Sequence, residues 1–167
     1  MAIRAAGEAD YAGAVDLAKH VLEIDPKFFY LSDPLAYSYA IAGRWQDCVD
    51  RAAAVQANAG DQPDVGVAIC HAKLGDAASA KQILQRMEAD ARTHYVDSSN
   101  IAGIYAALGD KDGALVAIER AYRDRSQPLL NIWFLPWFKS LHDDPRYQAL
   151  IDKIYAGAKT PMGASRR

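Results

Sequence analysis

IAGIYAALGDKDGA, residues 101–114, carries the spacing that decides the fold. A small residue is followed by an aromatic residue, a glycine and a second small residue, which are Ala102, Tyr105, Gly109 and Ala114. The spacing recurs in two earlier segments, residues 36–48 and 68–80. A further copy, which lacks its beginning, covers residues 2–14. The closing small residues follow one another at intervals of 34, 32 and 34 residues. The chain therefore contains an internal repeat about as long as one helical hairpin.

Each unit predicts a pair of antiparallel helices. A small residue such as Ala102 lets the partner helix approach closely, and Tyr105 fills the space beside it. Gly109 suits the left-handed turn that ends the first helix. His71 takes the aromatic position in the third unit, so we interpret it as a core imidazole rather than a metal ligand. Hydrophobic period and capping residues predict helices near residues 11–24, 34–42, 45–58, 63–74, 77–91, 98–108 and 111–124.

This pattern resembles the tetratricopeptide repeat (TPR) over residues 1–126, with the first unit truncated. The shared features are the period, the small-residue and aromatic positions, the turn glycines, and Asp25-Pro26 at the end of the first unit. The resemblance implies an all-α fold, a right-handed α-α superhelix (TPR solenoid) whose first helices line a concave face. It also implies that a peptide or a segment of a partner protein binds on that face.

The residues predicted to bind a partner lie on the first helices of successive units, opposite the side that packs on the paired helix. They are Asp33, Tyr37, Ile41, Val65, Ile69, Lys73, Ser99 and Gly103. The strip is mostly apolar, so a bound segment would bury apolar side chains there, and the few polar groups would fix its register. The alternative is that the larger apolar residues of the strip only pack between neighbouring helices.

We interpret residues 127–157 as a helical cap on the open end of the stack and residues 158–167 as a flexible tail. Pro136 can begin a short helix, and Asp144 can cap another that Pro145 opens. Four aromatic residues of this region either cover the last helix pair or form a secondary interface: Trp133, Phe134, Trp137 and Phe138. The region also resembles the C-terminal repeat regions of larger bacterial signalling proteins, downstream of nucleotide cyclase or winged-helix modules, which implies a regulatory role.

Composition and charge narrow the class of partner. The chain has 167 residues and a net charge of -2, and 51% hydrophobic with 24% charged residues is typical of a folded globular domain. A negative net charge without a base-reading motif disfavours nucleic acid. Residues 1–119 carry 17 acidic and 10 basic residues, whereas residues 120–167 carry 4 and 9. This asymmetry is either an ordinary solvated surface or a basic end that meets an acidic face, in cis or in a second copy.

The sequence favours a reducing, membrane-free location. The longest mainly apolar stretch, residues 129–138, is about half a membrane span. Glu8 and Asp10 lie where a secretory leader needs its apolar run. Cys48 and Cys70 lie on predicted apolar helix faces without a CxxC spacing, so we interpret them as two buried thiols and favour this over a disulfide. We therefore predict a cytoplasmic protein with no membrane partner.

No catalytic, metal or cofactor motif is found in the sequence. His142-Asp143-Asp144 has metal-ligand residue types, but helix capping explains Asp144 before Pro145. We therefore expect a non-enzymatic domain, without cofactor or metal, that binds a protein or peptide segment on the concave face. Two alternatives stay open. The chain could be a homo-oligomerisation module, or an enzyme whose ionisable groups converge from distant helices.

Overall fold

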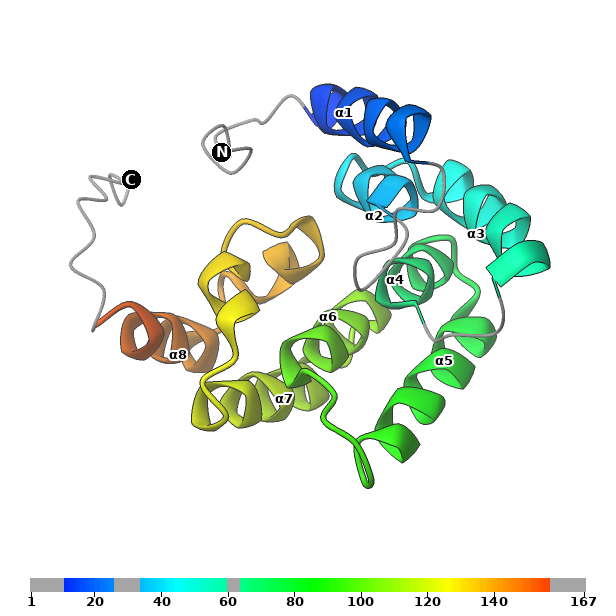
Figure 1. Cartoon of the computed structure of the whole chain (residues 1–167). Coiled ribbons are helices and arrows are strands. Elements are labelled where there is room, and N and C mark those ends of the chain that lie inside the picture. Colours follow the sequence, from blue (N-terminus) through cyan, green and yellow to red (C-terminus); the bar gives the residue numbers. More distant parts are fainter. Residues whose placement is uncertain (1–10, 26–33, 60–63, 157–167) are drawn as a thin grey trace.

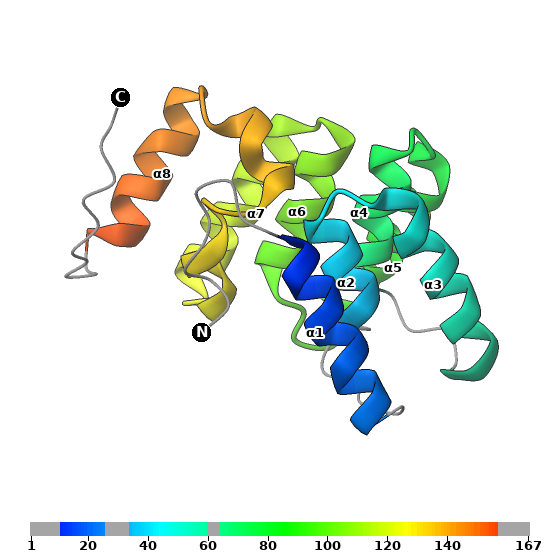
Figure 2. The same ribbon diagram turned by 90° about the horizontal axis from the view of Figure 1, so that it is seen from above.

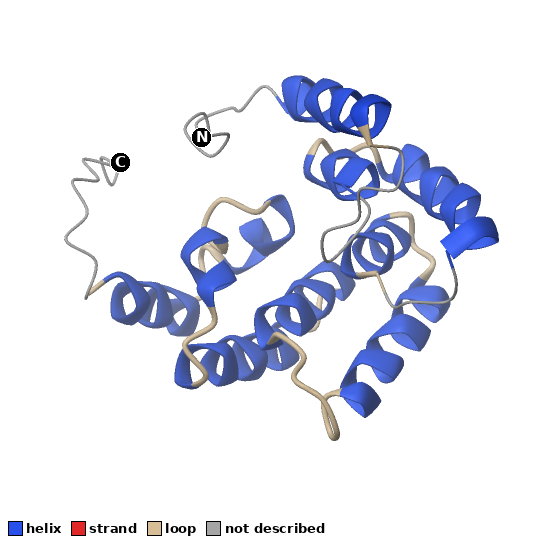
Figure 3. Ribbon diagram, in the orientation of Figure 1, coloured by secondary structure: helices blue, strands red, loops and turns tan. Residues whose placement is uncertain are grey.

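The structure is a computed structural model that describes residues 11–25, 34–59 and 64–156, and every regular element in these ranges is a helix (Figure 3). In chain order the elements are α1 (Tyr11–Ile24), α2 (Pro34–Ile41), α3 (Trp45–Ala59), α4 (Val65–Lys73), α5 (Ala77–Asp90), α6 (Ser98–Leu108), α7 (Lys111–Arg123), the 3-10 helices η2 (Gln127–Asn131) and η3 (Pro136–Leu141), and α8 (Pro145–Tyr155). The all-α prediction is confirmed, and α1 to α7 begin and end within two residues of their predicted bounds. None of these helices combines the length and apolarity that a membrane span requires. The predicted tail at residues 158–167 lies outside the described residues.

The helices pack as consecutive hairpins. α2 packs on α3, α4 on α5 and α6 on α7, and α4 also packs on α2 and on α6. Figure 1 shows the hairpins following one another from α1 at one end to α7 and α8 at the other, and Figure 2 shows from above that α8 and α3 lie on opposite sides of the molecule. The first helices of the hairpins, α2, α4 and α6, form a row that we refer to as the inner face.

Glycine ends the first helix of each hairpin. At the last turn the Asp110 amide donates to the Tyr105 carbonyl oxygen at 2.9 Å, and the other two turns contain the same kind of bond. Asp110 then caps the next helix, because its carboxylate accepts from the Gly113 amide at 2.8 Å. The turn residues have left-handed backbone angles, with φ of +71° at Gly43, +87° at Gly75 and +82° at Gly109.

The repeated small residues lie in the interior, as the repeat predicts. Wherever their side chains are described they are fully inaccessible: Ala36, Cys48, Ala68, Ala80, Ala102 and Ala114. The absence of a larger side chain lets the paired backbones approach, so that the core is close-packed. The rings beside them are half-buried and have polar partners. Tyr105 donates to the Glu88 carboxylate at 2.5 Å, and Nδ1 of His71 lies 3.1 Å from Asp76.

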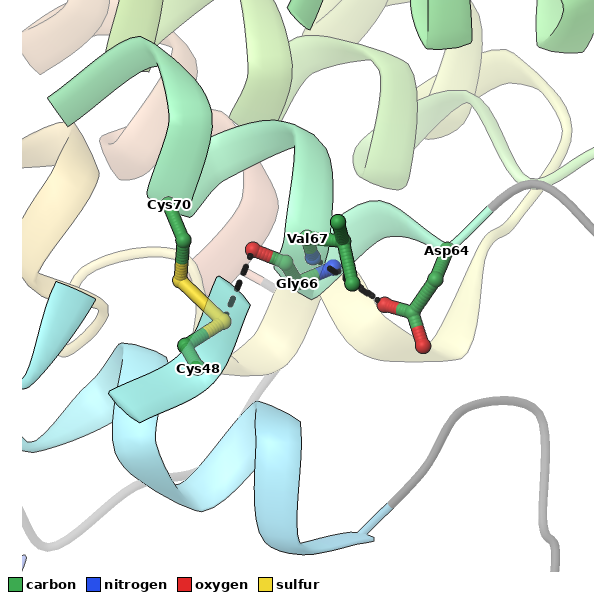
Figure 4. Close-up of a disulfide and its surroundings, with 5 residues drawn as sticks. All are labelled: Cys48, Asp64, Gly66, Val67 and Cys70. Carbon is green, nitrogen blue, oxygen red and sulfur yellow. Dashed lines mark hydrogen bonds between the residues drawn. A yellow bond between two sulfur atoms is a disulfide. The ribbon is translucent and has the colours of Figure 1, made fainter. Parts of the chain in front are cut away.

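Cys48 and Cys70 form a disulfide, so the prediction of two separate thiols is wrong (Figure 4). Cys48 belongs to α3 and Cys70 to α4, and their Cα atoms are 6.4 Å apart. Both residues are fully buried, as their apolar helix faces predicted. The sequence did not show that α3 and α4 pack on each other with these two faces in contact. Disulfides persist mainly in oxidising compartments, so the two cysteines do not support a reducing compartment.

Asp97 joins the start of α6 to the end of α7. Its carboxylate caps α6 by accepting from the Ser99 amide at 2.9 Å and from the Ser99 hydroxyl at 2.7 Å. It also accepts from the buried Ser126 hydroxyl at 2.7 and 2.8 Å. Arg120 of α7 donates to the Ser98 hydroxyl at 2.6 Å. These charge-assisted hydrogen bonds hold α6 and α7 together as a hairpin.

The part of the chain that comprises η2, η3 and α8, which we refer to as the C-terminal segment, folds back on the last hairpin. η3 packs on α6, α8 packs on α7, and η2 contacts α7 and α8. Phe138 and Tyr147 are fully buried and belong to the same core as the repeats. Asp144 caps α8 by accepting from the Arg146 amide at 2.9 Å, so the capping interpretation of this residue is confirmed.

His142 is a half-buried titratable group in the C-terminal segment. Its ring stacks on Trp133 with centroids 4.3 Å apart. Burial lowers the pKa of His142, and a hydrogen bond to the Trp133 backbone opposes this shift. The Nε2 atom is buried without a hydrogen-bond partner in the part of the chain that the structure describes. A proton on Nε2 would therefore lack an acceptor, so the folded state favours the neutral ring.

We expect the free energy of unfolding to fall as the pH drops below about 6.5, the ordinary pKa of histidine. Because the folded pKa of His142 is the lower one, the unfolded chain binds more protons in this interval, and acid favours unfolding. Denaturant titrations at a series of pH values measure the effect. His142→Phe keeps a ring in the stack and should lose less stability on acidification than the wild type.

His94→Phe is the matched control, because His94 is exposed. This variant should keep the wild-type pH dependence. The assignment to His142 would be contradicted if His142→Phe also kept the wild-type dependence.

Candidate functional site

Four of the predicted partner-binding residues converge on one cavity of about 50 Å³. Tyr37 comes from α2, Val65 from α4, and Ser99 and Gly103 from α6. The opposite wall is built by the C-terminal segment and its connecting residues, namely Pro128, Asn131, Ile132, Leu135 and Trp137. A cavity of this size holds water or a small apolar group. The site is thus enclosed between two walls, whereas the sequence predicted an open concave face.

Trp137 is the residue that closes the inner face. A Cβ atom at Gly103 would lie 3.0 Å from Nε1 of Trp137 and 3.4 Å from Cδ1 of Ile69. Tyr37 meets the same indole edge-on, with ring centroids 5.9 Å apart and an interplanar angle of 73°. Only 2% of Trp137 is exposed. Gly103 is therefore the position at which the backbone of α6 makes room for a large ring.

The other predicted partner-binding residues do not line the cavity. Ile69 is fully buried beside Gly103. Ile41 is half-buried against the core, and Lys73 is exposed at the end of α4. Asp33 lies outside the described residues. The accessible strip is therefore shorter than the sequence predicted, because part of the inner face lies under Trp137.

The four aromatic residues predicted to form a cap or a secondary interface point mostly inward. Trp137 and Phe138 are buried, and Trp133 and Phe134 are half-buried. The Phe138 ring stacks near Tyr147, with centroids 6.5 Å apart. Buried rings in a continuous core favour the cap interpretation over an exposed patch.

The cavity has neutral walls. None of its lining residues is Asp, Glu, Lys, Arg or His. Burial raises the pKa of Tyr37 to about 12, so its hydroxyl stays protonated at neutral pH. The polar lining groups include the amides of Asn100 and Asn131 and the Ser99 hydroxyl, which donates to Asp97. An uncharged, partly apolar segment suits such walls better than a charged one.

The residues that line the cavity offer hydrogen bonds and apolar contact. None of the lining residues is histidine or lysine, and the Ser99 hydroxyl donates to the Asp97 carboxylate at 2.7 Å. No group of three or more His, Cys, Asp or Glu side chains in residues 11–25, 34–59 and 64–156 could hold a metal ion.

Sequence reasoning missed Pro128, Asn131 and Leu135 as site residues. Pro128 and Pro136 each stand at the start of a short 3-10 helix, which indicates two changes of chain direction. The local sequence does not determine the direction in which the C-terminal segment folds back. That direction depends on a contact with another helix, because the Trp137 ring packs on Gly103 of α6.

Gly103→Ala tests the contact between Trp137 and Gly103, because its effect on the free energy of unfolding should change sign when Trp137 is removed. In the wild type we expect a loss of about 1 kcal/mol, because the added methyl group crowds Trp137 and Ile69. In a Trp137→Ala background the same substitution should stabilise by up to about 1 kcal/mol, because helix propensity then dominates. Denaturant titrations of the four proteins give the coupling free energy. Trp137→Leu replaces Trp137→Ala if the alanine variant does not fold.

Gly113→Ala provides the control, because a Cβ atom at Gly113 would meet the Tyr105 ring at 2.6 Å. Its effect should be the same in both backgrounds. Equal effects of Gly103→Ala in the two backgrounds would contradict the described position of Trp137.

Comparison with known proteins gives no relative for this chain: no protein-family model, no curated protein and no solved structure matches it.

Proposed function

We propose that this chain is a non-enzymatic, TPR-like interaction domain that binds a segment of a partner protein across the cavity between the inner face and the C-terminal segment, with a small apolar group of that segment inside the cavity. One observation carries the proposal. Residues from three successive first helices, Tyr37, Val65 and Gly103, share one neutral cavity with the C-terminal segment. A site assembled from several repeats and a cap suits an extended or helical ligand that runs across them.

The partner segment would bind through the half-buried residues of the cavity. Tyr37, Val65 and Leu135 offer apolar surface, and Asn100 and Asn131 offer amide groups that fix the register of a backbone. The Trp137 indole already rests on this face, which supports apolar contact there, and the remaining cavity of about 50 Å³ has room for one small apolar group of the partner.

The wider architecture belongs to the same proposal. Three hairpins with the same turn and the same buried small residues support a right-handed α-α superhelix, with the C-terminal segment as its cap. The resemblance to the repeat regions of bacterial signalling proteins supports a regulatory role within a larger protein. A cytoplasmic location stays a prediction, now without the argument from free cysteines.

Selection of peptides from a displayed library tests the proposal without a known partner. We expect enrichment of uncharged peptides that carry apolar residues. Asn100→Arg places a long cation over the cavity and should weaken their binding at least about tenfold, which isothermal titration calorimetry measures.

Gln82→Arg, at an exposed position of α5, is the matched control and should bind like the wild type. The proposal fails if no peptide is enriched above background, or if the selected peptides bind Asn100→Arg as tightly as the wild type.

A further inference from the structure

α1 has an exposed apolar stripe at the opposite end of the stack from α7 and α8 (Figure 1). Leu17 and Ile24 are 56% and 74% exposed. They are seven positions apart, so both lie on the same side of the helix. Each is preceded by an exposed acidic residue, Asp16 or Glu23, and the Glu23 carboxylate lies 3.3 Å from Nδ1 of His20 on the same helix. We refer to these four residues as the α1 stripe.

The other end of the stack has a groove of about 580 Å³ between α7, η2 and α8. Leu129 and Ile154 contribute apolar walls, and Leu130 beside them is 51% exposed. Arg123 and Arg125 also line the groove, and none of its lining residues is acidic. We refer to it as the basic groove.

The two surfaces complement each other. One is an apolar ridge with acidic side chains, and the other is an apolar hollow with basic ones. The same asymmetry appears along the chain, because acidic residues exceed basic ones in residues 1–119 and the reverse holds in residues 120–167. The surfaces do not meet within one molecule, because α1 and the helices of the groove lie at different ends of the stack (Figure 1).

We propose that the α1 stripe of one copy docks in the basic groove of a second copy, head to tail. Leu17 and Ile24 would enter the apolar hollow, while the two acidic residues approach the arginines. Each contact leaves one stripe and one groove free, so further copies can add in a row. One helix face in one groove is a small interface, below about 1,200 Å² in total, and its association is weak and salt-dependent.

Charge disfavours the chain's own C-terminal residues as the occupant of the groove. Residues 157–167 carry Lys159, Arg166 and Arg167 and no acidic side chain. Their charges would repel the arginines that line the groove. This self-association does not use the cavity of the inner face, so it can fail without affecting the proposed partner binding.

Sedimentation equilibrium of the full chain tests the proposal. At about 0.05 M salt the weight-average mass should rise with protein concentration above the 18.2 kDa monomer, and at about 0.5 M salt the association constant should be at least about tenfold lower. Ile24→Lys and Arg123→Glu should each return the mass to that of the monomer. Val116→Lys alters a 66% exposed side chain of α7 outside both surfaces and should associate like the wild type.

An equal mixture of the two disabled variants identifies the head-to-tail geometry. Ile24→Lys keeps an intact groove and Arg123→Glu keeps an intact stripe, so the mixture should form dimers and nothing larger. Circular dichroism verifies that each variant keeps its helices. The proposal is overturned if the wild type is monomeric at all concentrations, if either variant still associates, or if the mixture stays monomeric.

Discussion

The contact between the Trp137 indole and the backbone of α6 at Gly103 determines how the two parts of the chain fit together. A large ring can rest on a helix backbone only where no Cβ atom stands in the way, and here it would stand 3.0 Å from the indole nitrogen. The hairpins depend on the same constraint, since residues such as Ala102 and Ala114 are fully buried where paired helices meet. Close approach at a few small residues thus explains both the stacking of the repeats and the position of the C-terminal segment.

This constraint also shapes the site. An uncovered inner face would be an open groove. With Trp137 in place, the accessible part is a cavity with one wall from α2, α4 and α6 and the other wall from the C-terminal segment. Phe138 and Tyr147 fix the second wall, because they are buried in a core shared with the repeats. A bound segment would contact both walls at once. Its binding free energy would then depend on the geometry of the cap as well as on the repeats.

Local features were predictable from the sequence, and contacts between distant faces were not. Hydrophobic period, turn glycines and capping aspartates act within one or two helical turns, so the helices from α1 to α7 and the Asp144 cap could be placed. Cys48 and Cys70 were correctly placed on buried faces, but their pairing depends on how α3 packs on α4. Tyr37, Val65, Ser99 and Gly103 were found because they lie on the same face of the first helices, whereas Leu135 and Asn131 join them only through the return of the C-terminal segment.

Hydrogen exchange at the indole Nε1 of Trp137 measures whether the C-terminal segment leaves α6 independently of global unfolding. Nuclear magnetic resonance can distinguish its signal from those of Trp45 and Trp133 through single Trp→Phe variants. We expect protection equal to that of the most slowly exchanging α6 amides, because the ring should leave α6 only when the shared core unfolds. Rapid exchange of the Trp137 indole, with the α6 amides still protected, would show that the C-terminal segment detaches on its own and that the Trp137–Gly103 contact does not hold the two parts together.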